Sequence, residues 1–260
     1  MFDAAIDLHH ARILVSNDDG INAAGLNLLV KIAKSLCPDV WVVAPESEQS
    51  GASHSLTIQR PLRIRKLAPK RFAVDGTPTD CVLLAVNAIL KDKKPDLMLS
   101  GINAGGNMGE DVIYSGTVAA ALEATLLNVP AIALSLHSAG DGKFCWPTAA
   151  RFAPRIIRRL AATGWPSNTL INVNFPDLPP RRVKGVEVTA QGRRKLGDQL
   201  IERADPRGRL YYWIGPMRHE GASRRGTDIH AVNAGMVSLT PVFYDLTSRR
   251  VLNNLRKAFP

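Results

Sequence analysis

Ile13-Leu-Val-Ser-Asn-Asp-Asp-Gly20 is a short apolar run that leads directly into two adjacent carboxylates and a glycine. Along a regular strand, neighbouring side chains point to opposite faces, so Asp18 and Asp19 converge only where the strand ends and the backbone turns. Gly20 permits such a turn. Two neighbouring carboxylates repel each other unless a proton or a cation neutralises them, and hard divalent cations prefer oxygen ligands. The run therefore indicates a metal site, and the alternative is an Asn- and Asp-rich turn that caps the next helix.

Around this run, short apolar strands alternate with amphipathic helices. We expect strands at 12–16, 40–44, 95–100 and 131–135, helices at 25–36, 79–90 and 117–127, and a hairpin region within 56–74. Such alternation implies parallel pairing, so the predicted fold is α/β, with three layers around a mostly parallel sheet. Ligands of such folds bind beyond the carboxyl ends of the strands, where the polar loops of this chain fall.

The pattern changes after Val183. Strands are expected at 186–190, 210–214 and 236–239, and a terminal helix at 251–259. We divide the chain into a disordered leader (1–11), an α/β core (12–183) and a C-terminal segment (184–260) that completes the same domain and serves oligomerisation. An extended β arm with little core of its own is stabilised by packing on another surface, either a second copy of the chain or its own core.

Composition limits the setting. The chain has 260 residues, 45% of them hydrophobic and 22% charged, which is ordinary usage for a globular protein. The cysteines are distant in sequence and lack metal-type spacing, which favours free thiols in a reducing compartment, so a cytoplasmic location is expected: Cys37, Cys81 and Cys145. Polar residues interrupt the longest apolar stretch, Val118 to Leu136, so no membrane partner is expected.

The net charge of +10 attracts anions in general. The basic residues are dispersed in small clusters, with no aromatic-basic pattern of the RNA-recognition type. A solvated basic face explains this better than a nucleic-acid site, and no dedicated nucleic-acid partner is predicted.

Three loops contain candidate phosphate ligands. The loop 44–55 is rich in hydroxyls and contains His54, which is either a phosphate donor, an acid or an ordinary loop residue. The loop 100–109 is dense in glycine, so its backbone N–H groups are able to crowd an anion, with Asn103 or Asn107 adding an amide; a plain turn is the alternative. Ser115 and Thr117 open a helix and serve as an N-cap or as phosphate ligands. The predicted phosphate contacts are Asn17, Ser53, His54, Gly105, Asn107, Ser115, Gly116 and Thr117.

Other phosphate-handling and hydrolytic motifs are absent from the sequence. There is no Gly-x-x-x-x-Gly-Lys-Ser/Thr, and the glycine-rich run does not follow the first strand as in a dinucleotide fingerprint. No Gly-x-Ser-x-Gly elbow is present.

Taken together, the ordered blocks resemble the survival protein SurE family of nucleotidases from about residue 12 to near the C-terminus. The blocks are Ile13-Leu-Val-Ser-Asn-Asp-Asp-Gly, Val42-Val-Ala-Pro, Glu48-Gln-Ser-Gly-Ala-Ser-His-Ser, Gly76-Thr-Pro-Thr-Asp-Cys-Val, Ser100-Gly-Ile-Asn-Ala-Gly-Gly-Asn-Met-Gly, Ser115-Gly-Thr-Val-Ala-Ala-Ala-Leu-Glu, Gly226-Thr-Asp and Val237-Ser-Leu-Thr-Pro. The chain departs from the family pattern at Gly106, where proline or another residue is frequent, and at Ala124, where glycine commonly follows the glutamate.

The resemblance implies that residues 12–183 form a Rossmann-like catalytic core. It implies a metal-dependent 5′(3′)-nucleotidase that acts on nucleoside monophosphates with one Mg²⁺ or Mn²⁺ per subunit. It also implies a homodimer or homotetramer. The family's metal ligands fall on Asp18, Asp19, Ser50 and Asn103. Oxygen donors of this kind suit such an ion.

The predicted reaction is attack by a metal-activated water. Its predicted catalytic residues are Asp18, Asp19 and Asn103, and the sequence does not decide which Asp orients or deprotonates the water. A phosphoaspartate route usually needs a second Asp two residues after the first, where this chain has Gly20. The same loops also suit a noncatalytic nucleotide-binding sensor, which would bind without turnover.

Overall fold

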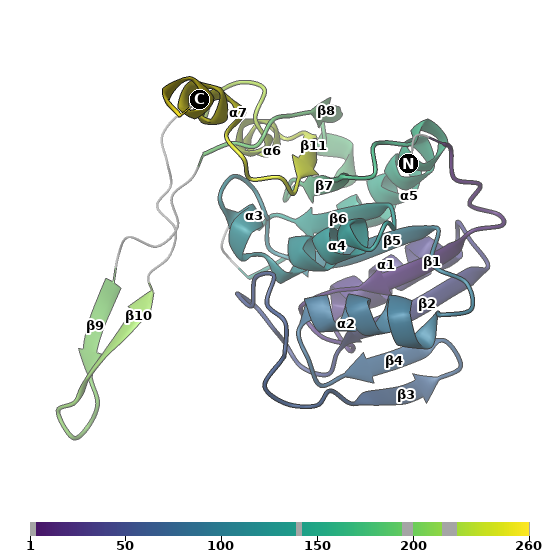
Figure 1. The fold of residues 1–260 in the computed structure, drawn as a ribbon, viewed down its shortest axis with the longest axis horizontal. Helices are drawn as coiled ribbons and strands as arrows, with labels where there is room; N and C mark the ends of the chain where they lie inside the picture. Colours follow the sequence, from purple (N-terminus) through teal and green to yellow (C-terminus); the bar gives the residue numbers. More distant parts are fainter. Residues whose placement is uncertain (1–3, 139–141, 194–199, 215–222, 260) are drawn as a thin grey trace.

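The structure, a computed structural model, describes residues 4–138, 142–193, 200–214 and 223–259. A large mixed sheet forms the centre of the molecule (Figure 1). Its strands are β1 (Arg12–Ser16), β2 (Asp39–Pro45), β3 (Ile64–Ala68), β4 (Arg71–Val74), β5 (Leu97–Ala104), β6 (Ala131–Leu136), β7 (Thr169–Phe175), β8 (Val186–Val188) and β11 (Val237–Phe243). Their order is β3-β4-β2-β1-β5-β6-β7-β11-β8. Neighbours from β4 to β7 are parallel, whereas β3 and β11 pair antiparallel with β4 and β7. The predicted α/β, mostly parallel architecture is confirmed.

Helices cover both faces of the sheet and make the three layers (Figure 1). The described helical segments are α1 (Ala24–Lys34), α2 (Pro78–Leu84) with its π-helical continuation η1 (Ala85–Ile89), α3 (Asp111–Tyr114), α4 (Gly116–Leu126), α5 (Trp146–Thr163), the 3-10 turn η2 (Pro180–Arg182), α6 (Asp228–Asn233) and α7 (Arg249–Ala258). None of the helices in the described ranges is long and apolar enough to cross a membrane.

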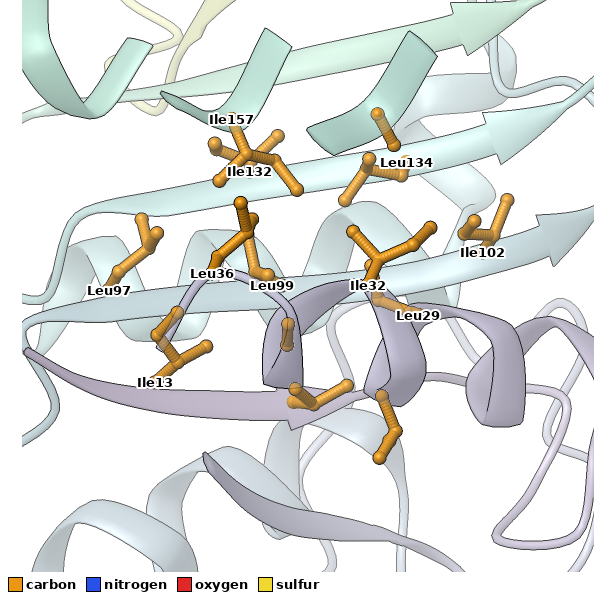
Figure 2. Close-up of a cluster of buried hydrophobic side chains, with 14 of the residues drawn as sticks. Ile13, Leu29, Ile32, Leu36, Leu97, Leu99, Ile102, Ile132, Leu134 and Ile157 are labelled. Atoms are coloured by element: carbon orange, nitrogen blue, oxygen red, sulfur yellow. The ribbon is translucent and has the colours of Figure 1, made fainter. Parts of the chain in front are cut away.

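The alternation of strand side chains builds two cores. Ile13 and Leu99 point into the cluster beneath α1 and α5, which Figure 2 shows with Leu29, Ile32 and Ile157. The intervening residues of the same strands, such as Leu14 and Met98, point into the cluster beneath α2 and α4. The continuous apolar runs Ile13–Val15 of β1 and Leu97–Leu99 of β5 are therefore explained by burial on both faces, as parallel sheets require.

Strand β5 runs four residues beyond its expected end. The glycine density after residue 100 predicted a loop, but β5 stays paired with β6 as far as Ala104, with a register shift between Gly101 and Asn103. A Cβ added at Gly101 would lie 2.2 Å from the carbonyl oxygen of Leu134, so glycine here permits close strand approach rather than a turn. As a result, Asn103 lies near the end of a strand and not on a free loop.

The part of the N-terminal leader that is described contacts the core. The backbone N–H of Ile6 donates to the carbonyl oxygen of Ala161 at 2.7 Å, and Leu8 belongs to the cluster beneath α1 and α5. Ile6 and Leu8 of the leader thus contact the core near α5. The composition of the leader did not predict this contact. Met1 to Asp3 lie outside the described residues.

The C-terminal segment divides between the main sheet and an arm. β8 and β11 extend the sheet at its β7 edge. A separate two-stranded sheet, β9 (Leu200–Ala204) and β10 (Leu210–Ile214), stands apart from the core (Figure 1). β10 was predicted, whereas its partner β9 was not.

Candidate active site

A cavity of about 450 Å³ lies at the carboxyl ends of β1, β2 and β5. The residues that line it are Asp18, Asp19, Ala23, Ala24, Gly25, Glu48, Ser50, Gly51, Asn103, Ala104, Asn107, Tyr114, Ser115, Phe144 and Trp146. The four predicted metal ligands are all among them. The first turn of α1 forms the floor, where a Cβ added at Gly25 would lie 1.9 Å from the carbonyl oxygen of Ile102. Only glycine allows the helix to approach β5 so closely.

Asp18 is buried at the N-terminus of α4. Its carboxylate accepts a hydrogen bond from the hydroxyl of Thr117, and a Cβ at Gly116 would lie 2.7 Å from the Cβ of Asp18. The N-terminus of a helix favours negative charge. Burial nevertheless raises the pKa of Asp18 to about 6, against the hydrogen bond from Thr117, and the charge of Asp19 adds to the rise. The anion at this helix end in the structure is thus a carboxylate of the protein itself.

Asp19 is less buried than Asp18. Its Oδ2 accepts a hydrogen bond from the backbone N–H of Ala104 at 3.3 Å. Burial is the main cause that raises its pKa, and the charge of Glu48 adds to it. No lysine or arginine is found among the described residues that line the cavity. Two neighbouring carboxylates with raised pKa values and no basic side chain beside them fit a cation site, because a cation would neutralise their charge.

The two neutral residues among the predicted metal ligands, Ser50 and Asn103, each donate one hydrogen bond within the protein. Asn103 donates its Nδ2 to the carbonyl oxygen of Gly105 at 2.9 Å, which leaves its side-chain oxygen as the atom suited to a cation. Ser50 donates its hydroxyl to Oε1 of Glu48 at 2.8 Å, so its lone pairs remain for a ligand. Over the described ranges, no group of three or more His, Cys, Asp or Glu side chains is arranged to hold a metal ion. Any metal here would depend on a mixed set of carboxylate, hydroxyl and amide oxygens.

The glycine-rich loop uses its backbone N–H groups inside the protein. Gly105 donates to the carbonyl oxygen of Leu136 at 3.0 Å, and Asn107 donates to the side-chain oxygen of Asn174 at 2.8 Å. Gly109 donates to a carboxylate oxygen of Asp228 at 2.9 Å. These N–H groups hold the loop in place and are not free for an anion, whereas the glycine density suggested a loop whose N–H groups bind one.

Of the predicted phosphate contacts, Asn107 and Ser115 line the cavity. Asn107 donates its Nδ2 to the hydroxyl of Ser135 at 2.8 Å. Ser115 caps α4 by accepting from the backbone N–H of Val118 at 3.0 Å, which is the N-cap role considered for it.

The other predicted phosphate contacts, which are Asn17, Ser53, His54, Gly105, Gly116 and Thr117, do not line the cavity. Several of their polar groups bind other parts of the protein. Asn17 donates to the carbonyl oxygen of Gly20 at 3.0 Å, and Ser53 donates to that of Ile113 at 2.7 Å. His54 shares a 2.9 Å hydrogen bond with Glu123. These hydrogen bonds close the turn after β1 and attach the loop 44–55 to α3 and α4.

An aromatic wall, defined as Tyr114, Phe144 and Trp146, was not predicted. The rings of Phe144 and Trp146 lie 5.6 Å apart with an interplanar angle of 38°. Both residues follow the segment after β6, where no spacing pattern singles them out. Glu48 was also missed as a third carboxylate of the cavity, although it stands in the hydroxyl-rich loop.

The fold and the cavity define a Rossmann-like α/β protein with an acidic ligand site at the carboxyl edge of a parallel sheet. A family model described as survival protein SurE matches residues 13–198. The chain belongs to the survival protein SurE family.

Relatives cover the full length of the chain. A protein of Paramagnetospirillum magneticum named 5′-nucleotidase SurE is 58% identical over 99% of both chains. Another of that name, from Rhodospirillum rubrum, is 52% identical over 100% of both. The crystal structure of the SurE protein from Aquifex aeolicus superposes with a TM-score of 0.84 at 41% identity, covering 96% of this chain and 100% of that one.

We predict that Asp18→Asn stabilises the metal-free protein at high pH. Because the folded-state pKa of Asp18, about 6, lies above the ordinary value of 3.8, its ionised form destabilises the fold. This cost is absent below about pH 4, develops up to about pH 6 and is complete above that. Chemical unfolding in the presence of a chelator should show a gain of about 2–3 kcal/mol at pH 8 that disappears near pH 4.

Asp39→Asn is the control of opposite sign. Burial raises the pKa of Asp39, but hydrogen bonds from Lys70, Arg12 and Trp41 outweigh it and lower the pKa to about 2. This variant should lose stability at neutral pH, and the loss should shrink as the pH falls from about 4 to 2. An Asp18→Asn variant no more stable than wild type at pH 8 contradicts the prediction.

Proposed function

We propose that the chain is a metal-dependent phosphomonoesterase that hydrolyses nucleoside 5′- and 3′-monophosphates to nucleoside and phosphate. The observation that carries the proposal is the convergence of Asp18, Asp19, Ser50 and Asn103 on one cavity at the carboxyl edge of the sheet. The name 5′-nucleotidase given to the relatives supports the same reaction class.

Those four residues would hold one divalent ion per subunit, Mg²⁺ or Mn²⁺. The donor set fits such an ion because its anionic members lie in a cavity without a lining lysine or arginine in the described chain. When bound, the ion would polarise the phosphoryl group and lower the pKa of the attacking water.

The protein's own groups divide the remaining tasks. Asp18 is held by Thr117 and is buried, which suits a fixed ligand. Asp19 is less buried and is hydrogen-bonded through Oδ2, so we assign it the role of orienting the water and accepting its proton. Asn107 and Ser115 would contact the phosphoryl oxygens, beside the positive end of α4.

The aromatic wall would bind the nucleoside. Aromatic rings offer a large apolar surface for stacking a flat base, and they stand in the same cavity as the acidic residues. The net charge of +10 would favour the approach of anionic substrates. This arrangement supports nucleotides over small phosphorylated sugars as the substrate class.

The arm supports assembly as a homodimer or homotetramer. Apolar side chains of the β9–β10 hairpin are exposed, including Leu200 (65%), Trp213 (63%) and Ile214 (79%). Exposed apolar groups on a projecting element indicate a surface that another copy covers. The free thiols Cys37, Cys81 and Cys145 support the cytoplasmic location that we propose for the assembly.

Metal removal should abolish phosphate release from nucleoside monophosphates, and Mn²⁺ or Mg²⁺ should restore it. Loss of a residue that merely orients a metal ligand lowers metal affinity or activity about 10- to 100-fold. Asp19→Asn removes a negative charge from the metal ligands and also the proton acceptor, so it should lower kcat by about 100-fold or more. Phosphate released in ¹⁸O-labelled water should contain the label, because water attacks the phosphorus.

Asp7→Asn is the matched control, since Asp7 is a surface residue that does not line the cavity, and it should leave kcat unchanged. Full activity of the chelated protein would refute the metal mechanism. Nucleotide binding without turnover would instead identify a noncatalytic sensor.

Trp146→Ala should raise KM for nucleoside monophosphates by about tenfold while KM for ribose 5-phosphate changes little, because base stacking on an aromatic ring is lost. Tyr114→Ala should act in the same direction. Steady-state kinetics with both substrates, alongside the exposed Trp213→Ala as control, measure the difference. Equal changes for the two substrates would show that the aromatic wall does not contact the base.

Light scattering of the full-length chain should give a dimer or tetramer at micromolar concentration. Replacing Leu200, Trp213 and Ile214 together by serine should reduce association and leave the circular dichroism of the core unchanged, because these side chains lie on the exposed arm. A monomeric full-length chain excludes the assembly.

A further inference from the structure

The two ends of the arm meet in a neck, which we define as Ala190–Gly192 and Gly226–Asp228. Ala190 donates its backbone N–H to the carbonyl oxygen of Gly226 at 2.9 Å, and Asp228 donates to that of Ala190 at 3.0 Å. An isolated parallel bridge joins Ala190 and Thr227. The neck therefore brings the chain just before Arg193 next to the chain just after Arg225.

Asp228, in the neck, is fully buried, with an exposed fraction of 0%. Its Oδ1 accepts from the backbone N–H groups of Gly192 and Ile229, each at 2.7 Å, and its Oδ2 accepts from that of Gly109 at 2.9 Å. A buried carboxylate is costly unless such bonds compensate it. A Cβ at Gly192 would lie 2.7 Å from Oδ1, so glycine permits this contact.

Both backbone groups of Gly109 are bound by the neck. Asp228 accepts from its N–H, and Gln191 donates its Nε2 to the carbonyl oxygen of Gly109 at 2.7 Å. Gly109 follows Asn107 in the glycine-rich loop and precedes α3, which leads to Tyr114 and Ser115 at the cavity.

Strand β7 also holds the glycine-rich loop, at Asn107. Asn172 and Asn174 of β7 donate their side-chain amides to the carbonyl oxygen of Asn107 at 2.8 and 3.0 Å. Strand β7 thus holds the loop at Asn107, and the neck holds it at Gly109.

We propose that Asp228 is a positioning residue of the reaction: together with Gln191 it fixes the loop 105–110, so that the base of the arm sets the geometry of the cavity. The inference rests on the proposed function. Asparagine at position 228 would turn an NH₂ group toward a backbone N–H, and the loop would shift away. A misplacement of about 1 Å at a catalytic group lowers the rate about 100-fold.

The test compares Asp228→Asn with Gln191→Met, which removes one hydrogen bond to Gly109 from an exposed side chain and so preserves folding. The matched control is Asp205→Asn: Asp205 also accepts backbone N–H groups, those of Arg207 and Arg209, but in the hairpin turn. The measurements are kcat, KM, the Kd for Mn²⁺, and hydrogen exchange of the peptide 105–114 relative to peptides of β1 and β5.

We expect kcat to fall about 100-fold for Asp228→Asn and about tenfold for Gln191→Met, with the Kd for Mn²⁺ changed less than about threefold. Exchange in 105–114 should rise about tenfold or more while β1 and β5 stay protected, because loss of the neck contacts opens the loop locally. Asp205→Asn should match wild type. A merely structural role would lower the melting temperature without changing kcat per folded molecule or exchange of this one peptide.

Wild-type kcat and exchange in folded Gln191→Met, or in folded Asp228→Asn, would overturn the proposal. If Asp228→Asn does not fold, the Gln191→Met result decides alone. A wild-type protein that releases no phosphate from any nucleoside monophosphate overturns the proposed function itself, which is a different outcome from active wild type with unaffected variants.

Discussion

A carboxylate at the end of a buried strand is stable only if the surrounding chain compensates its charge. The hydroxyl of Thr117 and the N-terminus of α4 compensate the charge of Asp18 only in part, because burial still raises its pKa to about 6. Because Gly116 leaves no space between the helix and Asp18, the position of α4 is set by that contact. The helix in turn places Ser115 at the cavity, and the preceding helix α3 places Tyr114 there. The remaining deficit of positive charge makes the site receptive to a cation.

The sequence predicted the framework well because its signals are local. Continuous apolar runs, turn residues and helical periodicity identify β1, β2, β6 and α4, and the carboxyl-edge rule then brings Asp18, Asp19, Ser50 and Asn103 together. The same reasoning failed where a residue type has two uses. Glycine at 101 permits strand contact as well as turns, which is why the end of β5 was placed too early.

The hydrogen-bond partners of the polar side chains could not be predicted from the sequence for a different reason. His54 bonds to Glu123 and Asn107 to Asn174, pairs that are distant in sequence and that no spacing rule connects. The loops rich in hydroxyls and amides suggested ligand contacts. Most of these groups instead form hydrogen bonds within the protein, because buried polar atoms require partners. The aromatic wall depends on the path of the chain after β6, which only the tertiary fold determines.

The contact between Gly25 and β5 has a consequence for natural variation and for engineering. Even a methyl group at position 25 would press on the carbonyl of Ile102 and displace the neighbouring Asn103. Substitution at this position is therefore opposed by packing and also by the proposed role of Asn103 as a metal ligand. A library that seeks new substrates should leave position 25 untouched and diversify Tyr114 instead, because its side chain is exposed at the cavity, whereas Phe144 and Trp146 pack against the core.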